Sequence, residues 1–172
     1  MPDGPPRSPT SCGSLPPEGA AGRLGSARRR TGVVIDTNIA LDLLVFDDRG
    51  HDALAAALAA GQLEWIATAA MRDEFARVLG YPLIAQRLQA RGLEAEAVLA
   101  AFDARSRKID SSPPRARCVC SDPDDQVFID LAVAHGARLL SKDRAVLAMR
   151  KRLAAWGVVV SAGWTAPVAG AA

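Results

Sequence analysis

Short runs of aliphatic and β-branched residues alternate with stretches of helical periodicity along most of the chain. The apolar runs predict strands at 33–36, 64–67, 138–141 and 158–161, with a weaker one at 117–120. The periodic stretches between them predict helices at 38–46, 50–60, 69–79, 82–90, 94–106, 124–135 and 144–155. Strands that alternate with helices are typical of βαβ units, so we expect an α/β fold: a three-layer α/β/α sandwich with a central, mainly parallel sheet.

The two ends of the chain depart from this pattern. Residues 1–31 hold six of the eleven prolines and otherwise mostly Gly, Ala, Ser and Arg, so they have little to bury. Such a composition is typical of disordered segments. We therefore predict a disordered leader at 1–31, one folded domain at 32–166 and a disordered tail at 167–172.

The charge of the chain is uneven. The leader has five arginines and two acids, whereas the rest has 16 bases and 17 acids. Arg28–Arg30 could make weak phosphate contacts, and a solvated leader is the simpler alternative. No apolar run approaches the ~20 residues that cross a membrane, and the N-terminus lacks the hydrophobic segment of a secretory signal. We expect a cytoplasmic protein with no membrane partner.

The cysteines do not indicate a disulfide framework. They are odd in number, and Cys12 falls in the predicted leader. Cys118 and Cys120 form a lone Cys-x-Cys, and neither His51 nor His135 lies at the spacing of a zinc ligand. We expect reduced, structural thiols.

Asp36 ends the first apolar run and precedes a predicted helix. In open α/β sheets, the carboxyl edge of the strands is where ligands and metal ions bind. This makes Asp36 the first candidate for chemistry. The alternative is that Asp36 only caps the following helix, because Asp is a preferred N-cap residue.

Glu74 lies on the apolar stripe of the helix at 69–79, on the same face as Phe75. An ionised carboxylate that faces a core is costly unless it is paired or bound to a metal. Glu74 is therefore a second candidate. The alternative is an acid at the edge of the stripe that reaches water or pairs with Arg72 or Arg77.

Three carboxylates fall within residues 122–125. Asp122 before Pro123 has the form of an N-cap followed by proline at the first helical position, and acids there suit the helix dipole. Carboxylates this close repel one another, and a divalent cation would relieve the repulsion. We favour Asp125 as the metal ligand, because it lies beside the predicted buried face, and expect Asp130 to be exposed or only supporting.

Asp143 repeats the arrangement of Asp36, because an apolar strand delivers residues 141–143 to its carboxyl end. The carboxyl ends of parallel strands lie at one edge of the sheet. A helix that starts at Asp125 runs away from this edge and the next strand returns to it. We therefore expect four carboxylates from four elements to converge: Asp36, Glu74, Asp125 and Asp143.

Four segments in this order resemble the motifs of the PIN domain, a nuclease fold, over residues 32 to about 161. Val-Val-Ile-Asp36-Thr-Asn resembles the first motif and Met71-Arg-Asp-Glu74-Phe the second. The third is matched by Asp125-Gln-Val-Phe-Ile-Asp-Leu-Ala132 with His135-Gly136, and the fourth by Leu140-Ser141-Lys-Asp143. Each motif alone is weak, but four in order at fitting separations are a strong signal.

The Asp-Pro-Asp-Asp form of the third motif is similar to a branch of toxins from toxin–antitoxin pairs, related to VapC-like endoribonucleases. The resemblance implies that Asp36, Glu74, Asp125 and Asp143 surround Mg²⁺ or Mn²⁺, with Asn38 and Ser141 as polar supports. One departure is Ala145, which stands where many members have a further acid. The four acids remain, but a second metal position is in doubt.

A hard divalent cation held by carboxylates can activate a water molecule and neutralise charge on a leaving oxygen. We therefore predict a Mg²⁺- or Mn²⁺-dependent hydrolase. The residues themselves indicate only a phosphodiester, and the resemblance to the toxin branch implies an endoribonuclease acting on RNA. The bases that could contact RNA are Arg72, Lys142, Arg144, Arg115 and Arg117.

Other functions were weighed against this one. A haloacid-dehalogenase-like phosphatase needs an Asp two residues after Asp36, where Asn38 stands, and a response-regulator receiver needs an acid pair and a lysine that cannot both be assigned. A PIN-like module that binds RNA or protein without cutting stays open, as does a DNA-directed nuclease. The resemblance implies RNA, an antitoxin protein and a second copy of the chain, in a homodimer, as partners.

Overall fold

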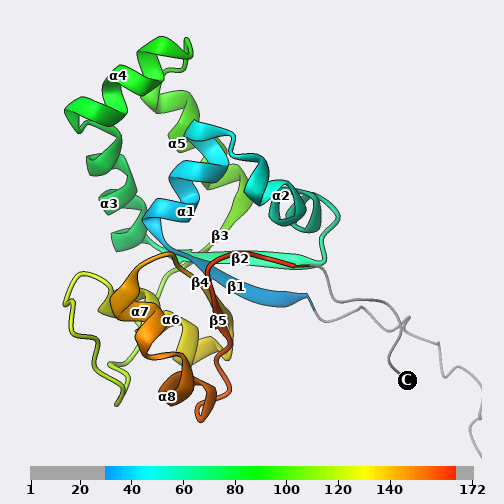
Figure 1. The fold of residues 1–172 in the computed structure, drawn as a ribbon, viewed down its shortest axis with the longest axis vertical. Coiled ribbons are helices and arrows are strands. Elements are labelled where there is room, and N and C mark those ends of the chain that lie inside the picture. Colours follow the sequence, from blue (N-terminus) through cyan, green and yellow to red (C-terminus); the bar gives the residue numbers. More distant parts are fainter. Residues whose placement is uncertain (1–29, 166–172) are drawn as a thin grey trace, which may run out of the picture.

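The computed structural model describes residues 30–165 and arranges them as a sheet between two layers of helices (Figure 1). The strands lie in the order β3-β2-β1-β4-β5, and every neighbouring pair is parallel. Their bounds are β1 (Thr31–Ile35), β2 (Leu63–Thr68), β3 (Ser106–Ile109), β4 (Arg138–Leu140) and β5 (Val160–Ser161). The predicted three-layer α/β/α sandwich is confirmed, and its sheet is parallel throughout.

The helices divide between the two faces according to the direction in which the chain crosses the sheet. From β1 the chain moves to β2 and β3, then returns past β1 to β4 and β5, and right-handed crossovers in opposite directions lie on opposite faces. One face carries α1 (Thr37–Leu41), its π-helical continuation η1 (Asp42–Phe46), the 3₁₀ turn η2 (Arg49–His51), α2 (Asp52–Ala59), α3 (Ala69–Leu79), α4 (Pro82–Ala90) and α5 (Ala95–Arg105). The other carries α6 (Gln126–His135), α7 (Arg144–Ala148) and α8 (Arg150–Ala154).

The central strands are buried on both faces, as parallel strands between helices must be. Residues 33–35 of β1 are at most 3% exposed. On one face, Trp65 of β2 meets Phe102 of α5 edge to face, with ring centroids 4.7 Å apart, and Phe102 stacks on Phe75 of α3 at 5.0 Å. This packing holds α3, the helix that carries Glu74, against the sheet.

The prediction of a strand at 117–120 is wrong, because this segment forms no strand. Ala116, Cys118 and Cys120 are buried and alternate with exposed neighbours, which is the period-two pattern of a strand. Their backbone is bonded to a side chain instead: Gln126 Nε2 donates to the Cys118 carbonyl (3.1 Å), and the Cys120 N–H donates to Gln126 Oε1 (2.8 Å). The segment is a loop held against α6.

The fifth strand is β3, which pairs with β2 at the edge of the sheet. Its sequence, Ser-Arg-Lys-Ile, is mostly polar, and Arg107 and Lys108 are exposed. Polar and charged residues are common in edge strands, which have one unpaired side. The apolar pattern could therefore not reveal β3.

The predicted helical start at Asp122 and Pro123 is also wrong, since α6 begins at Gln126. Asp122 accepts the Asp124 N–H at 3.0 Å and so closes a turn ahead of the helix. Farther along α6, Asp130 Oδ1 accepts Gln126 Nε2 (2.6 Å) and the Ala116 N–H (2.8 Å). Asp130 was expected to be either exposed or supporting, and these bonds agree with a supporting role.

The remaining boundaries differ by a few residues. The helix predicted at 144–155 is two short helices, α7 and α8, separated at Met149, and the strand predicted at 158–161 is reduced to β5. The helix predicted at 38–46 is present as α1 continued by η1. Cys118 and Cys120 are buried and free, as expected for structural thiols.

The expectations for residues 1–29 and 166–172, including Cys12, lie outside the described residues. The first described strand begins at Thr31. Within residues 30–165, every helix is too short or too polar to cross a membrane.

The structure predicts that Gln126 stabilises the fold through the loop at 116–120. Gln126→Met keeps the length of the side chain but leaves the Cys118 carbonyl and the Cys120 N–H without partners. Each buried unsatisfied group costs about 1–3 kcal/mol, so we expect the free energy of unfolding in urea to fall by about 3 kcal/mol. The matched change in an exposed helix, Gln89→Met, should alter it by less than about 0.5 kcal/mol; equal effects would show that the bonds of Gln126 contribute nothing.

Candidate functional site

Asp36 lies directly after β1 and is almost fully buried, at 2% exposure. Its N–H donates to the Leu140 carbonyl (3.0 Å), which continues the pairing of β1 with β4. Its Oδ1 accepts the Ile39 N–H (2.9 Å) and caps α1. Asp36 Oδ2 is buried and has no hydrogen-bond partner among residues 30–165. The capping role anticipated as an alternative therefore uses one oxygen, and the other is left for a ligand.

The turn after β4 supports Asp36 from the neighbouring strand. The fully buried Ser141 side chain and the backbone N–H groups of Asn38 and Lys142 lie close enough to the Asp36 carboxylate to lower its pKa. The Ser141 hydroxyl oxygen accepts the Asp143 N–H at 3.0 Å. Ser141 thus lies between the Asp36 carboxylate and the backbone of Asp143, and Asn38 lines the adjoining cleft.

Asp143 and Asp125 meet beside Asp36. Asp143 caps α7 by accepting the Ala145 N–H (2.6 Å), and its side chain is within hydrogen-bonding reach of Asp125. Burial, together with the smaller effects of the nearby carboxylates of Asp143, Asp122 and Asp36, raises the pKa of Asp125 to about 7. Asp125 Oδ2 is also buried, and no residue in the described part of the chain forms a hydrogen bond with it by distance and angle.

Burial likewise raises the pKa of Asp36 above its ordinary value, although the hydrogen bonds from Ser141 and from three backbone N–H groups act in the opposite direction. Two neighbouring carboxyl groups are thus both held where their ionised forms are disfavoured. A bound cation would reverse this preference.

Glu74 faces the same cleft from α3 but lies at its rim. Its side chain is 40% exposed, and both its oxygens are bound by Arg77, with Nη2 2.6 Å from each and Nε 2.9 Å from Oε2. Pairing with Arg77 was one of the two alternatives for this residue. The pair brings a positive charge to the edge of an acidic site.

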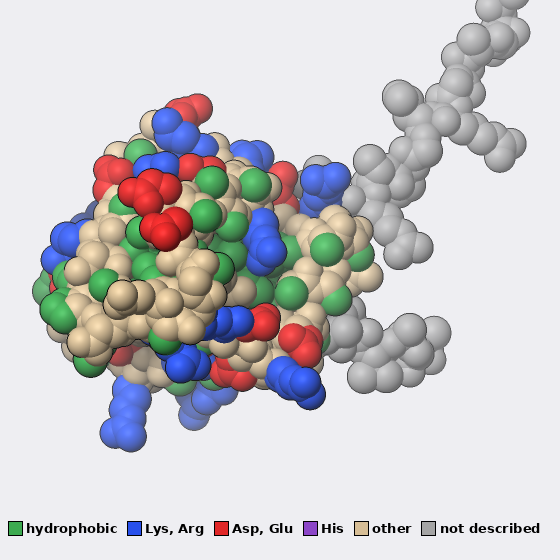
Figure 2. All heavy atoms as spheres, turned by 90° about the horizontal axis from the view of Figure 1, so that it is seen from above, with side chains coloured by type: hydrophobic (Ala, Val, Ile, Leu, Met, Phe, Trp, Pro, Cys, Tyr) green, Lys and Arg blue, Asp and Glu red, His purple; other side chains and the backbone are tan. Residues whose placement is uncertain are grey.

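The cleft has a volume of about 760 Å³ and an acidic floor beneath apolar walls. Asp36, Glu74, Asp124 and Asp125 line it, while Asp143 adjoins it through Asp125. The walls come from α3, α4 and α6 and include Val78, Tyr81, Leu83, Ile84, Val127 and Phe128. On the face seen from above the view of Figure 1, acidic, basic and hydrophobic side chains are interspersed (Figure 2).

The donor set fits Mg²⁺ or Mn²⁺, because hard divalent cations prefer carboxylate oxygens. The observation that points to an ion is the pair of buried oxygens without partners, Asp36 Oδ2 and Asp125 Oδ2. Buried polar atoms are nearly always satisfied, so two orphans in neighbouring carboxylates indicate a missing ligand. Asp36, Asp125 and Asp143 could hold the ion directly, with Glu74 beside them.

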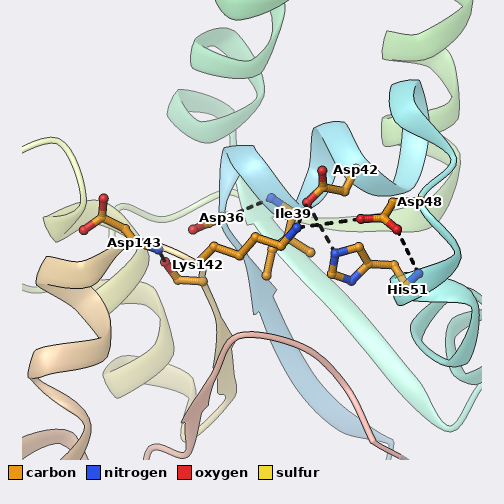
Figure 3. Close-up of polar contacts among 9 residues, drawn as sticks. Asp36, Ile39, Asp42, Asp48, His51, Lys142 and Asp143 are labelled. Carbon is orange, nitrogen blue, oxygen red and sulfur yellow. Dashed lines mark hydrogen bonds and ion pairs between the residues drawn. The ribbon is translucent and has the colours of Figure 1, made fainter.

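A second group of candidate ligands was missed by sequence reasoning. It comprises Asp42 of η1, Asp48 and His51 of η2, whose ligand atoms lie within 4.8 Å of one another and could hold a metal ion. The Lys142 ammonium already lies among them, 2.5 Å from Asp42 Oδ2 (Figure 3). We call these four residues the Lys142 cluster. No periodicity relates Lys142 to the other three, so no sequence signal could have found it.

The bases predicted to contact RNA differ in their surroundings. Arg72 is paired with Asp103 through two bonds of 2.6 and 2.8 Å, and Lys142 is held by Asp42. The other three are exposed and form no ion pair with any residue between 30 and 165: Arg115, Arg117 and Arg144. Contact of these five bases with RNA stays a prediction.

The raised pKa of Asp125 predicts how the stability of the metal-free protein depends on pH. Between about pH 4 and 7 the folded Asp125 keeps a proton that the unfolded carboxyl has lost, so stability falls as the pH rises through this window. In EDTA, Asp125→Asn should therefore unfold at higher urea concentration than the wild type at pH 8, and the two should converge near pH 4. If the two proteins differed in unfolding midpoint by the same amount at every pH, the raised pKa of Asp125 would not be the cause of the difference.

Comparison with known proteins agrees with the motifs. A family model described as PIN domain matches residues 32–145, which is more than half of the chain. No match was found among curated proteins. PIN domains are generally nucleases that use divalent metal ions. The matched segment runs from β1 into α7 and contains all four carboxylates of the candidate site. The chain therefore belongs to the PIN-domain family.

Proposed function

We propose that this protein is a metal-dependent endoribonuclease that hydrolyses RNA phosphodiesters with Asp36, Glu74, Asp125 and Asp143. The observation that carries the proposal is the pair of orphaned, buried oxygens of Asp36 and Asp125 at the floor of an open cleft. Folding has brought carboxylates together without supplying the positive charge that they require. Such an arrangement is costly to stability and is typical of a site built for a cation.

The residues of the chain hold the site in a defined geometry. The Ile39 N–H fixes Asp36 through Oδ1, which leaves Oδ2 without a partner among the described residues and free to bind an ion. Asp143 is fixed in the same way by the start of α7. A divalent cation bound there supplies an activated water and neutralises charge on the phosphodiester.

An acidic site repels RNA, which is a polyanion, so positive groups are needed beside it. Arg77 and the exposed bases can supply them. Arg77 lies between Glu74 and the cleft residue Tyr81, with its guanidinium 5.6 Å from the centre of the Tyr81 ring. It can stay with Glu74 while its remaining N–H groups face a phosphate. Arg115, Arg117 and Arg144 would hold flanking phosphates.

The biological role that we propose is the toxin of a type II toxin–antitoxin pair, acting on RNA in the cytoplasm as a homodimer and held inactive by an antitoxin protein. The Asp-Pro-Asp-Asp form of residues 122–125 supports this role, because it resembles that toxin branch. A short open reading frame for a DNA-binding protein beside the gene would support it further. A DNA-directed nuclease and a non-cleaving RNA- or protein-binding module are the competing functions.

Cleavage of labelled RNA tests the activity. Purified protein with Mn²⁺ should cut RNA, EDTA should abolish cutting, and Asp36→Asn or Asp125→Asn should lower the rate at least about a hundredfold, because a lost metal ligand costs about 3 kcal/mol or more of transition-state stabilisation. Glu96→Gln, an exposed acid of α5, is the charge-matched control. Equal background in every lane would favour the binding module, and cutting confined to DNA would favour the DNA-directed nuclease.

Metal binding can be measured without any substrate. Mn²⁺ should raise the melting temperature of the wild type, because a ligand that binds only the folded state stabilises it. Asp125→Asn should keep the fold but lose most of this rise, whereas Glu96→Gln should keep the full rise. A similar rise in Asp125→Asn would place the Mn²⁺ site elsewhere, with the Lys142 cluster as the first alternative.

A further inference from the structure

The Lys142 cluster joins the helix after β1 to the turn after β4. Lys142 Nζ lies 2.5 Å from Asp42 Oδ2 and 4.0 Å from Asp48 Oδ2, and His51 Nε2 lies 3.3 Å from the same Asp42 oxygen. Figure 3 shows the Lys142 side chain extended from its turn to this group. Lys142 and Asp42 are 100 positions apart, so the contact exists only in the folded chain.

The ammonium supplies the cation that this cluster requires. Asp42 is mostly buried, with its side chain 15% exposed, and His51 is 4% exposed. A carboxylate held in such a place needs a positive partner. Lys142 provides it from the chain itself, at the point where the ligand atoms of Asp42, Asp48 and His51 converge.

The backbone of Lys142 belongs to the carboxylate site. The Asp36 N–H donates to the carbonyl of Leu140, just before this turn, at 3.0 Å. The Lys142 N–H and the Ser141 side chain lie close enough to the Asp36 carboxylate to lower its pKa, and the residue after Lys142 is Asp143. The side chain of Lys142 therefore anchors the turn that carries Ser141 and Asp143 to Asp42. A lysine that is 42% exposed would otherwise sample many rotamers, and the turn would lose this restraint.

We propose that Asp42 is a positioning residue: by holding Lys142, it keeps the turn at 141–143 at the separation from Asp36 that a shared metal ion requires. His51 supports Asp42 on the side away from the metal site. The inference rests on the proposed function of the carboxylate site and extends it to residues that touch neither metal nor RNA.

The proposal makes a different prediction from a direct RNA contact by Lys142. If the ammonium bound phosphate, Asp42→Asn would release it toward RNA and lower KM, while Lys142→Met would raise KM. If Asp42 positions the turn, both changes should weaken the metal site in the same way. KM should then stay nearly constant while kcat falls.

The experiment compares Asp42→Asn, Lys142→Met, the double variant and Lys142→Arg in the full chain. Mn²⁺ affinity without RNA is measured by electron paramagnetic resonance, kcat and KM on labelled RNA, and amide hydrogen exchange over residues 141–145. We expect about tenfold weaker Mn²⁺ binding in each single variant, because groups that orient metal ligands typically contribute about 10- to 100-fold. The double variant should lose no more than either single one, and Lys142→Arg should retain most of the affinity.

Asp47→Asn is the matched control. Asp47 follows η1 and pairs with Arg91 at 3.5 Å, but its side chain is 82% exposed, and asparagine tolerates its left-handed backbone with φ of 51°. This variant removes the same charge five residues from Asp42 without touching the turn after β4. It should leave Mn²⁺ affinity and exchange at 141–145 unchanged.

Unchanged Mn²⁺ affinity and exchange in Asp42→Asn, as in the control, would overturn the proposal. A lower KM in Asp42→Asn with unchanged kcat would overturn it in favour of the RNA contact. A wild type that neither binds Mn²⁺ nor cleaves RNA would overturn the proposed function and the metal part of this inference together. Hydrogen exchange in the same samples would then test the anchoring of the turn separately. Faster exchange at 141–145 in Asp42→Asn than in the control would support the anchoring, and equal exchange would contradict it.

Discussion

The main constraint on this structure is the repulsion between carboxylates that the fold brings together in a largely buried site. Asp36 and Asp125 each present a buried oxygen that the described part of the chain leaves without a partner, and burial raises the pKa of both. Hydrogen bonds from Ser141 and from the start of α1 compensate Asp36 only in part. Such a pair contributes nothing to stability by itself, which is why we propose a cation-binding role for it.

The order of the strands explains why the carboxylates meet. The chain leaves β1 in one direction to form β2 and β3, and later returns to the other side of β1 to form β4 and β5. The connections after β1 and β4 therefore diverge to opposite faces and open a crevice at the carboxyl ends of these two neighbours. Asp36 follows one strand and Asp143 lies in the turn after the other, while Glu74 and Asp125 reach the crevice from α3 and from the start of α6. The Lys142 cluster joins η1, after the first of these strands, to the turn after the second.

The apolar pattern was sufficient for the buried strands and insufficient at the edge. β1, β2 and β4 are recognisable because both their faces are buried, whereas β3 is a polar edge strand. Ala116, Cys118 and Cys120 alternate in burial with their neighbours as a strand does, but no strand pairs with them. The Gln126 side chain forms the hydrogen bonds that a partner strand would form. Periodicity reports which side chains are buried and does not report what their backbone bonds to.

By itself the sequence determined the layered α/β fold and the positions of Asp36 and Asp143. Asp36 comes directly after an apolar strand and Asp143 shortly after another, and the ends of both strands must lie at one edge of the sheet. It also marked Glu74 and Asp125, through helical periodicity and local charge density. For Glu74, the structure selected pairing with Arg77 within α3, which was one of the alternatives that the sequence offered. The tertiary structure alone decided that Asp125 shares its environment with Asp143 and that Lys142 is bound to Asp42. The physical reason is that these contacts depend on distances between elements, and the spacing of residues along the chain carries no information about them.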